Sequence, residues 1–145
     1  MTARRIFVVD TNVVVAGLIT ADSDSPTARI LDAMLRGRLI YLVSGDLLQE
    51  YIDVLSRPRL FRYHGLDRSQ IDRLSVEIAA NALWRDPSAD TNFVSPDPND
   101  AHLWALLASE PASILITGDQ LLIDNPRPNR SIISPATWAA QFCRI

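Results

Sequence analysis

The sequence predicts an α/β domain built around a parallel sheet, and three observations support this prediction. Short apolar runs rich in β-branched residues occur at residues 6–9, 39–43 and 113–117. Runs of this kind are typical of strands that are buried on both faces of a parallel sheet. Segments with helical spacing separate the runs, as right-handed parallel crossovers require. Acidic residues follow close behind the runs, which points to a polar site at one edge of the sheet.

The size and charge of the chain favour one globular domain that spans residues 1–145. The chain is 48% hydrophobic and 21% charged, and it can bury roughly two-thirds of its unfolded surface. It carries 14 basic and 17 acidic residues, for a formal net charge of −3. This balance is unlike that of a basic nucleic-acid binder. A role on nucleic acid would therefore need a local basic patch or bound metal ions.

The residue types that are missing exclude several classes of site. All 14 basic residues are arginine, which disfavours Walker-type phosphate loops, receiver domains and haloacid dehalogenase-like phosphatases, because each needs a lysine. Those phosphatases also place a second aspartate two residues after the first, where this chain has Asn12. A single Cys143 cannot form an internal disulfide, and without a cysteine or histidine cluster a zinc site is disfavoured.

The start of the sequence resembles a signal peptide, but its apolar run is too short for one. Arg4 and Arg5 precede an apolar run, but Asp10, Thr11 and Asn12 interrupt that run after four residues. No stretch of eighteen apolar residues occurs, so we expect no membrane span. With a single cysteine and no internal disulfide, we expect a cytoplasmic location by default.

Helical spacing and capping residues predict the first helices. A helix over residues 26–36 has Ser25 as its N-cap, a proline in its first position and Gly37 at its end. A second helix over residues 46–56 has Ser44 available as a cap. Glu50 shares the apolar face of this helix, whereas Asp53 and Arg57 are predicted to form a solvated ion pair on its outer face.

The rest of the chain is predicted as follows. A polar loop containing Phe61, Tyr63 and His64 leads into a long helix over residues 67–84. A proline- and aspartate-rich stretch then contains a short strand at residues 92–95, and Asp97 caps a buried helix that runs to residue 108. The last elements are one helical turn at residues 121–123, a strand at 131–134 and a helix at 135–142.

Four acidic residues are placed by these predictions at the carboxyl-terminal edge of the sheet. Asp10 follows the first strand, and Asp119 lies two residues after Thr117. Asp100 opens the helix that follows the strand at 92–95, and Glu50 lies on the inward face of the helix that follows 39–43. Ligands of open parallel sheets bind at this edge.

Each acid also has a structural explanation of its own. Asp10 and Asp119 are both compatible with turns, and Asp97 and Asp100 with a helix start. Glu50 is compatible with a buried glutamate held by a tyrosine or arginine. Together, however, clustered carboxylates raise one another's pKa values unless cations neutralise them. With no lysine in the chain, oxygen ligands of this kind favour Mg²⁺ or Mn²⁺.

Four segments in this order resemble the PIN-domain nucleases, in the subgroup of toxin components of toxin–antitoxin pairs. They are Val9-Asp10-Thr11-Asn12-Val13, the predicted helix around Glu50 that ends in Ser56-Arg57-Pro58, Asp97-Pro98-Asn99-Asp100-Ala101, and Thr117-Gly118-Asp119-Gln120-Leu121-Leu122.

The resemblance implies a Rossmann-like, three-layer domain with four or five parallel strands. It also implies a metal-dependent ribonuclease site of Asp10, Glu50, Asp100 and Asp119, with Asp97 as an accessory acid. Asn12 and Thr117 would support these acids. Asn99 stands where many members of the family carry a further acid. A small antitoxin protein and a homodimer are the partners that the resemblance implies.

The expected activity is therefore hydrolysis of RNA phosphodiester bonds with Mg²⁺ or Mn²⁺. Arg57, Arg59 and Arg62 are candidates for contacts to the RNA backbone, although solvated surface arginines explain them as well. The alternatives are a structure-specific DNA nuclease and a protein-binding module without catalysis. We expect His64 and His102 to be structural, with His102 facing away from Asp100.

Overall fold

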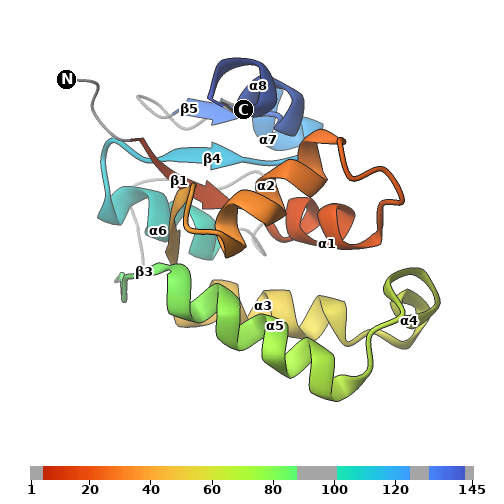
Figure 1. Cartoon of the computed structure of the whole chain (residues 1–145). Helices are drawn as coiled ribbons and strands as arrows, with labels where there is room; N and C mark the ends of the chain where they lie inside the picture. Colours follow the sequence, from red (N-terminus) through yellow and green to blue (C-terminus); the bar gives the residue numbers. More distant parts are fainter. Residues whose placement is uncertain (1–4, 88–100, 125–130, 143–145) are drawn as a thin grey trace.

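Five parallel strands form one sheet at the centre of the molecule (Figure 1). The computed structural model describes residues 5–87, 101–124 and 131–142. The strands are β1 (Ile6–Val9), β2 (Ile40–Val43), β3 (Leu83–Trp84), β4 (Ile114–Ile116) and β5 (Ser131–Ile133). They pair in the order β3-β2-β1-β4-β5, with all four pairings parallel. The predicted α/β class and parallel sheet are confirmed.

Helices connect the strands and flank the sheet, which gives a three-layer domain. They are α1 (Thr11–Ile19), α2 (Pro26–Leu35), α3 (Gly45–Leu55), α4 (Pro58–His64), α5 (Arg68–Asn81), α6 (Ala101–Ser109), α7 (Gln120–Asp124) and α8 (Pro135–Gln141). The connections from β1 to β2 and on to β3 run in one direction across the sheet, while β4 and β5 lie on the other side of β1. Since parallel crossovers are right-handed, the two sets of helices cover opposite faces.

The strand order creates a topological switch point between β1 and β4. β1 pairs with β2 on one side, where Ile6 lies opposite Ile40, and with β4 on the other side, where Val9 lies opposite Ile116. The connection after β1 leads toward β2, whereas the connection after β4 leads toward β5 on the other side. In parallel sheets, a crevice between the carboxyl ends of the two strands forms at such a point. The loops after these two strands begin with Asp10 and Thr117.

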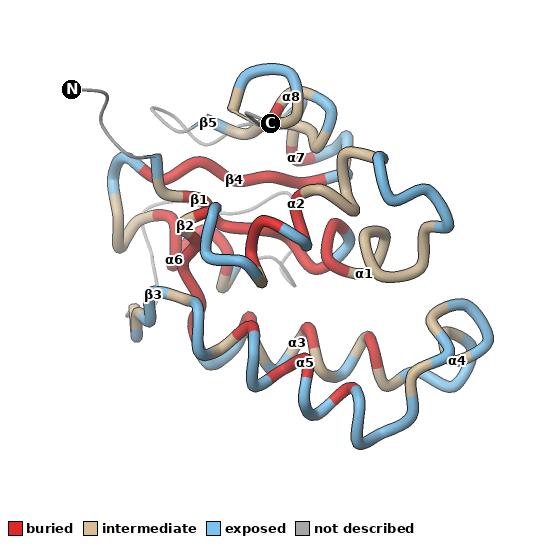
Figure 2. The backbone as a smooth tube through the Cα atoms, viewed as in Figure 1, coloured by how far each residue is buried: buried red, intermediate tan, exposed pale blue. Residues whose placement is uncertain are grey.

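The core is made by the strands and by one face of each long helix (Figure 2). Val8 and Val9 are fully buried, as the continuous apolar run predicts. Tyr41 on β2 is also fully buried, and its hydroxyl donates a 2.6 Å hydrogen bond to the carbonyl of Ile78 on α5. Burial raises the pKa of Tyr41 to about 12. This bond ties the helix layer to the sheet.

Helix α1 is an element that the sequence analysis did not predict. It contains five β-branched residues, which have modest helix propensity. Its stability comes from packing: Val13 and Val14 are buried, and α1 lies close against α2. Gly17 makes this close approach feasible, because a Cβ at that position would lie 2.5 Å from the carbonyl oxygen of Thr27.

Two predictions about the middle of the chain are wrong. The expected loop around Phe61 forms helix α4, which Pro58 begins and Gly65 ends with a left-handed φ of 67°. The long helix predicted over 67–84 ends at Asn81, and residues 83–84 form edge strand β3 beside Leu42 and Val43. Pairing with β2 overrides the helical pattern there. The strand predicted at 92–95 lies outside the described residues.

The caps predicted for α2 and α3 are confirmed. The Ser25 hydroxyl accepts a hydrogen bond from the backbone N–H of Ala28, and the Ser44 hydroxyl accepts one from that of Leu47. The strand at 131–134 and the helix at 135–142 form within one residue of their predicted bounds. Within the described parts of the chain, no helix combines the length and apolar character that a membrane span needs.

Candidate active site

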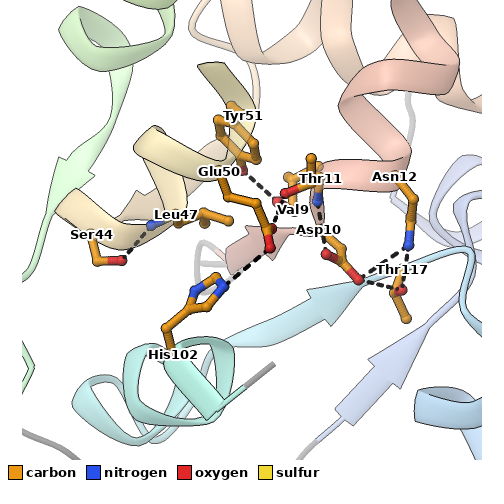
Figure 3. Close-up of polar contacts among 10 residues, drawn as sticks. All are labelled: Val9, Asp10, Thr11, Asn12, Ser44, Leu47, Glu50, Tyr51, His102 and Thr117. Carbon is orange, nitrogen blue, oxygen red and sulfur yellow. Dashed lines mark hydrogen bonds and ion pairs between the residues drawn. The ribbon is translucent and has the colours of Figure 1, made fainter. Parts of the chain in front are cut away.

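Asp10 is the buried centre of the polar edge of the sheet (Figure 3). It caps α1, and only 5% of it is exposed. Its Oδ1 accepts a 2.8 Å bond from the backbone N–H of Thr11. Its Oδ2 accepts bonds from the Thr117 hydroxyl at 2.8 Å and the Asn12 amide at 3.2 Å. The carboxylate is thus fixed by three donors.

The pKa of Asp10 is nevertheless raised above its ordinary value of 3.8. Burial is the largest cause, because it removes water from the charged form. The hydrogen bonds from Thr117 and Thr11 act in the opposite direction, while the negative charges of Glu50 and Asp119 raise the pKa further. The three acids therefore lie near enough to interact electrostatically.

Thr117 and Asn12 link the ends of β1 and β4 across the switch point. The fully buried Thr117 hydroxyl donates to Asp10 and accepts a 3.0 Å bond from the backbone N–H of Asp119. The side-chain oxygen of Asn12 accepts a 2.9 Å bond from the backbone N–H of Gly118. Both residues therefore stand where the sequence analysis expected supporting groups, in contact with Asp10 and with the loop that carries Asp119.

Glu50 reaches this site from α3, on the far side of β1 from Asp119. The Thr11 hydroxyl donates to its Oε2, and His102 Nε2 lies 3.5 Å from its Oε1. The pKa of Glu50 is lowered, chiefly by its hydrogen bond to His102 and also by that from Thr11 and by the positive field of Arg57. Burial opposes these effects.

The contact between Glu50 and His102 was not anticipated from the sequence. Helix α6 packs with α3 so that the imidazole faces Glu50 (Figure 3). The expected orientation of His102 away from Asp100 stays a prediction, because Asp100 lies outside the described residues. Spacing along α6 alone does not show which residues of another helix it meets. His64 does have a structural role, because its ring nitrogens contact the Leu55 carbonyl and the Leu66 backbone N–H.

The predicted ion pair between Asp53 and Arg57 is also corrected. Asp53 lies on the exposed face of α3, but its Oδ1 accepts a 2.8 Å bond from the amide of Gln49, one turn earlier. No ion pair of Asp53 occurs among the described residues. Arg57 is exposed, and its charge acts on Glu50 instead.

Asp119 is half-buried at the end of β4. Its Oδ1 accepts a 3.0 Å bond from the backbone N–H of Leu121 in the first turn of α7. Asp119 therefore has the turn role that its position after Gly118 predicts. Its negative charge also raises the pKa of Asp10. Asp97, Asn99 and Asp100 lie outside the described residues.

The described acids fit a hard divalent cation only as part of a site. Asp10 Oδ1 accepts one protein hydrogen bond, so it retains a lone pair for a cation. In residues 5–87, 101–124 and 131–142, no arginine pairs with Asp10, Glu50 or Asp119, so their charge is not neutralised by a guanidinium. These same residues contain no group of three histidine, cysteine, aspartate or glutamate side chains close enough to hold a metal ion.

The candidate RNA-binding arginines lie around α4. Arg57 is the N-cap residue, and Arg59 and Arg62 are exposed on the helix itself. The Arg62 guanidinium lies 5.4 Å from the ring centroid of Tyr63, which is 59% exposed. The helix packs against α1, so this basic and aromatic surface projects from the domain near the helix that follows Asp10.

Comparison with known families places these features in context. A family model of the PIN domain matches residues 6–121, which include β1, α3, α6, β4 and the three described acids. The chain belongs to the PIN domain family. PIN domains are generally metal-dependent nucleases and use divalent ions, which agrees with the chemistry of the acids at the switch point. A comparison with curated proteins found no match.

Two residues that connect β1 and the start of α1 to α3 were not singled out from the sequence of this PIN domain. Thr11 follows Asp10 directly, but its bond to Glu50 joins residues 39 positions apart. Tyr51 occupies the next position after Glu50, and its hydroxyl donates to the carbonyl of Val9. Adjacency to a predicted acid is the only sequence signal for either residue.

Proposed function

We propose that this PIN domain is an endoribonuclease that hydrolyses RNA phosphodiester bonds with Mg²⁺ or Mn²⁺. One observation carries the proposal: Asp10, Glu50 and Asp119 follow the carboxyl ends of the neighbouring strands β1, β2 and β4, and Glu50 and Asp119 raise the pKa of the buried Asp10. An arrangement that leaves carboxylates close together and without a paired arginine favours a cation ligand.

Each residue has a defined task in this proposal. Asp10, Glu50 and Asp119, with Asp100 and the accessory Asp97, would hold the ion. Thr117 and Asn12 keep the Asp10 carboxylate oriented by donating to its Oδ2. When bound, the divalent ion supplies a Lewis acid that lowers the pKa of water and stabilises the leaving oxygen.

The surface around α4 supports a nucleic-acid substrate. Arg57 is exposed, and its positive charge lowers the pKa of Glu50. A phosphate bound by Arg57 would therefore lie near the acids. Tyr63 offers an exposed ring on which an unpaired base can stack, and stacking of this kind is characteristic of single-stranded RNA recognition. Two bound divalent ions would also shift the net charge from −3 to about +1.

The first prediction tests this activity with Asp10→Asn. The substitution removes a charged ligand at nearly constant volume, so cleavage of single-stranded RNA in Mn²⁺ should be abolished while the fold is retained. Rates on RNA, single-stranded DNA and flapped DNA should be measured with and without chelator. Asp32→Asn on α2 is the matched control, because Asp32 is exposed and pairs with Arg36.

The outcomes separate the proposal from its alternatives. Faster cleavage of flapped DNA than of RNA would favour a structure-specific DNA nuclease. Near-normal activity of Asp10→Asn would refute the assigned site. Absence of both cleavage and Mn²⁺ binding in the wild-type chain would favour a protein-binding module.

We further propose that the chain acts as the toxin of a toxin–antitoxin pair, with a small antitoxin protein as its partner and a homodimer as its assembly. The four resembling segments support this assignment. Induced expression of the wild-type chain should arrest growth, Asp10→Asn should not, and co-expression of an adjacent small open reading frame should restore growth. Light scattering of the purified chain tests the homodimer.

A further inference from the structure

Thr11 contacts both of the acids that flank β1, and it does so with two different groups. Its backbone N–H donates to Asp10 Oδ1 at 2.8 Å, and its hydroxyl donates to Glu50 Oε2. Only 6% of Thr11 is exposed, so water does not replace these bonds easily. In Figure 3 the residue lies between the two carboxylates.

We propose that Thr11 is a positioning residue that sets the place of Glu50 relative to Asp10 for cation binding. Asp10 is tied to the end of β1 and to β4, whereas Glu50 arrives on α3, a separate element. Without a tie, a glutamate side chain with three rotatable bonds would sample several rotamers. The Thr11 hydroxyl selects the rotamer that keeps Oε2 beside the N-terminus of α1.

A second bond between the same segments supplies the comparison that the test needs. The Tyr51 hydroxyl donates its hydrogen bond to the carbonyl of Val9 and so also connects α3 to β1, whereas the Thr11 hydroxyl donates to a carboxylate. Tyr51→Phe therefore removes a hydrogen bond that connects α3 to β1 but involves no carboxylate. Thr11→Val removes the hydroxyl that binds Glu50 next to Asp10. A merely structural role for Thr11 would make the two variants behave alike.

The first arm of the test needs neither activity nor metal. Denaturant unfolding in chelator is measured for Thr11→Val, Glu50→Ala and the double variant. If the hydroxyl acts through Glu50, Thr11→Val lowers the unfolding midpoint in the wild-type background and has little further effect in Glu50→Ala. Equal shifts in both backgrounds would overturn the contact.

The second arm measures Mn²⁺ affinity by calorimetry. Thr11→Val should weaken binding about 10- to 100-fold, the range found when groups that orient metal ligands are lost. Thr11→Ser retains the hydroxyl and should restore an affinity near that of the wild type. Tyr51→Phe should lower the melting temperature and leave the affinity nearly unchanged. Equal affinity in Thr11→Val and wild type would overturn the positioning role.

The catalytic consequence rests on the proposed ribonuclease function and is measured separately. Thr11→Val should lower kcat for RNA cleavage with little change in KM, because the RNA-binding surface is intact. Absence of cleavage, together with coupling between Thr11 and Glu50 in unfolding and weaker Mn²⁺ binding by Thr11→Val, would reject RNA hydrolysis alone. Cleavage and Mn²⁺ affinity that are both insensitive to Thr11→Val would reject the positioning role alone.

Discussion

Asp10 shows how one residue combines two opposing influences. Burial and the charges of Glu50 and Asp119 favour its protonated form, whereas the donors Thr117 and Thr11 favour the carboxylate. The donors hold the side chain in place, but they do not supply a positive charge. A buried carboxylate that has donors and, within the described parts of the chain, no ion pair is suited to receive a cation, and this is the residue-level basis of the proposed function.

At this scale we predict the effect of Thr117→Val. The variant keeps the volume of the side chain but removes a hydrogen bond to a buried carboxylate, so the free energy of unfolding at neutral pH should fall by about 1–3 kcal/mol. The loss also raises the pKa of Asp10 further above 3.8.

The pH dependence of this loss has a definite sign. A carboxyl group whose folded pKa is raised gives its most favourable contribution at low pH, and that contribution is lost as the pH rises through the folded pKa. The deficit of Thr117→Val should therefore be largest at neutral pH and shrink as the pH falls through the raised pKa of Asp10. Urea unfolding between acidic and neutral pH measures it, with Thr27→Val as control. A deficit that grew toward low pH would contradict the assignment.

Elements determine which side chains reach the site, and α3 is the clearest case. The helix buries Leu47, Tyr51 and Leu55, which places Glu50 beside the sheet edge and leaves Asp53 exposed. The predicted helical phase was therefore right for Glu50. The ion pair expected for Asp53 was wrong because Gln49, on the same exposed face, bonds to it instead.

The phase of α3 predicts unequal effects for Glu50 and Asp53. Glu50→Gln should reduce Mn²⁺-dependent cleavage by at least about 10- to 100-fold, since it removes the charge that faces Thr11 and His102. Asp53→Asn should leave the rate nearly unchanged, because Asn can still accept the bond from Gln49. Initial rates on one RNA substrate compare them, and equal losses would show that the assigned face is incorrect.

The packing of α1 on α2 gives a second prediction at this scale. Gly17→Ala should lower the free energy of unfolding by about 1–3 kcal/mol, because its Cβ would overlap the backbone oxygen of Thr27 and push the helices apart. Gly45→Ala at the first position of α3 is the control. Nothing lies within 4 Å of a Cβ there, so this variant should be neutral or slightly stabilising. Thermal melts of both variants test the close approach.

The whole molecule brings the acids together through its strand order. Residues on separate connections, such as Asp10 and Asp119, meet because β1 and β4 are neighbours although more than a hundred residues separate them. In the proposed cation site, the charges of Glu50 and Asp119 disfavour the buried Asp10 carboxylate in the metal-free fold, and a bound cation would offset this repulsion. Coupling of this kind makes the stability of the domain depend on metal.

This coupling predicts the behaviour of Asp119→Asn. Removing that charge lowers the pKa of Asp10 and relieves repulsion, and Asn retains an oxygen for the Leu121 backbone N–H. The variant should therefore melt at a higher temperature than the wild type in chelator at neutral pH. Saturating Mn²⁺, at about 100 times its Kd, should stabilise the wild type by about 2.7 kcal/mol and the variant much less.

Thermal melts in chelator and in Mn²⁺ decide this prediction. Its contrary is a structural network, in which loss of Asp119 leaves donors unsatisfied and lowers stability in both conditions. A variant that melts below the wild type in chelator, with neither protein responding to Mn²⁺, would rule out a convergent cation site.

By itself the sequence determined the alternation of strands and helices, the main caps and the residues of β1. These features depend on local periodicity and on hydrogen bonds between near neighbours, as at Ser25 and Ser44. It also placed Asp10 and Asp119 at strand ends and Glu50 on the inward face of the following helix, because parallel topology directs these positions to one edge of the sheet.

Only the tertiary structure decided the elements and contacts that depend on distant partners. Helix α1 forms despite its valines because it packs on α2, and residues 83–84 leave the helical pattern because β2 offers them hydrogen bonds. The bonds of Glu50 with Thr11 and His102 join three separate elements. No local pattern encodes such pairings, since their free energy is realised only when the sheet has brought the elements together.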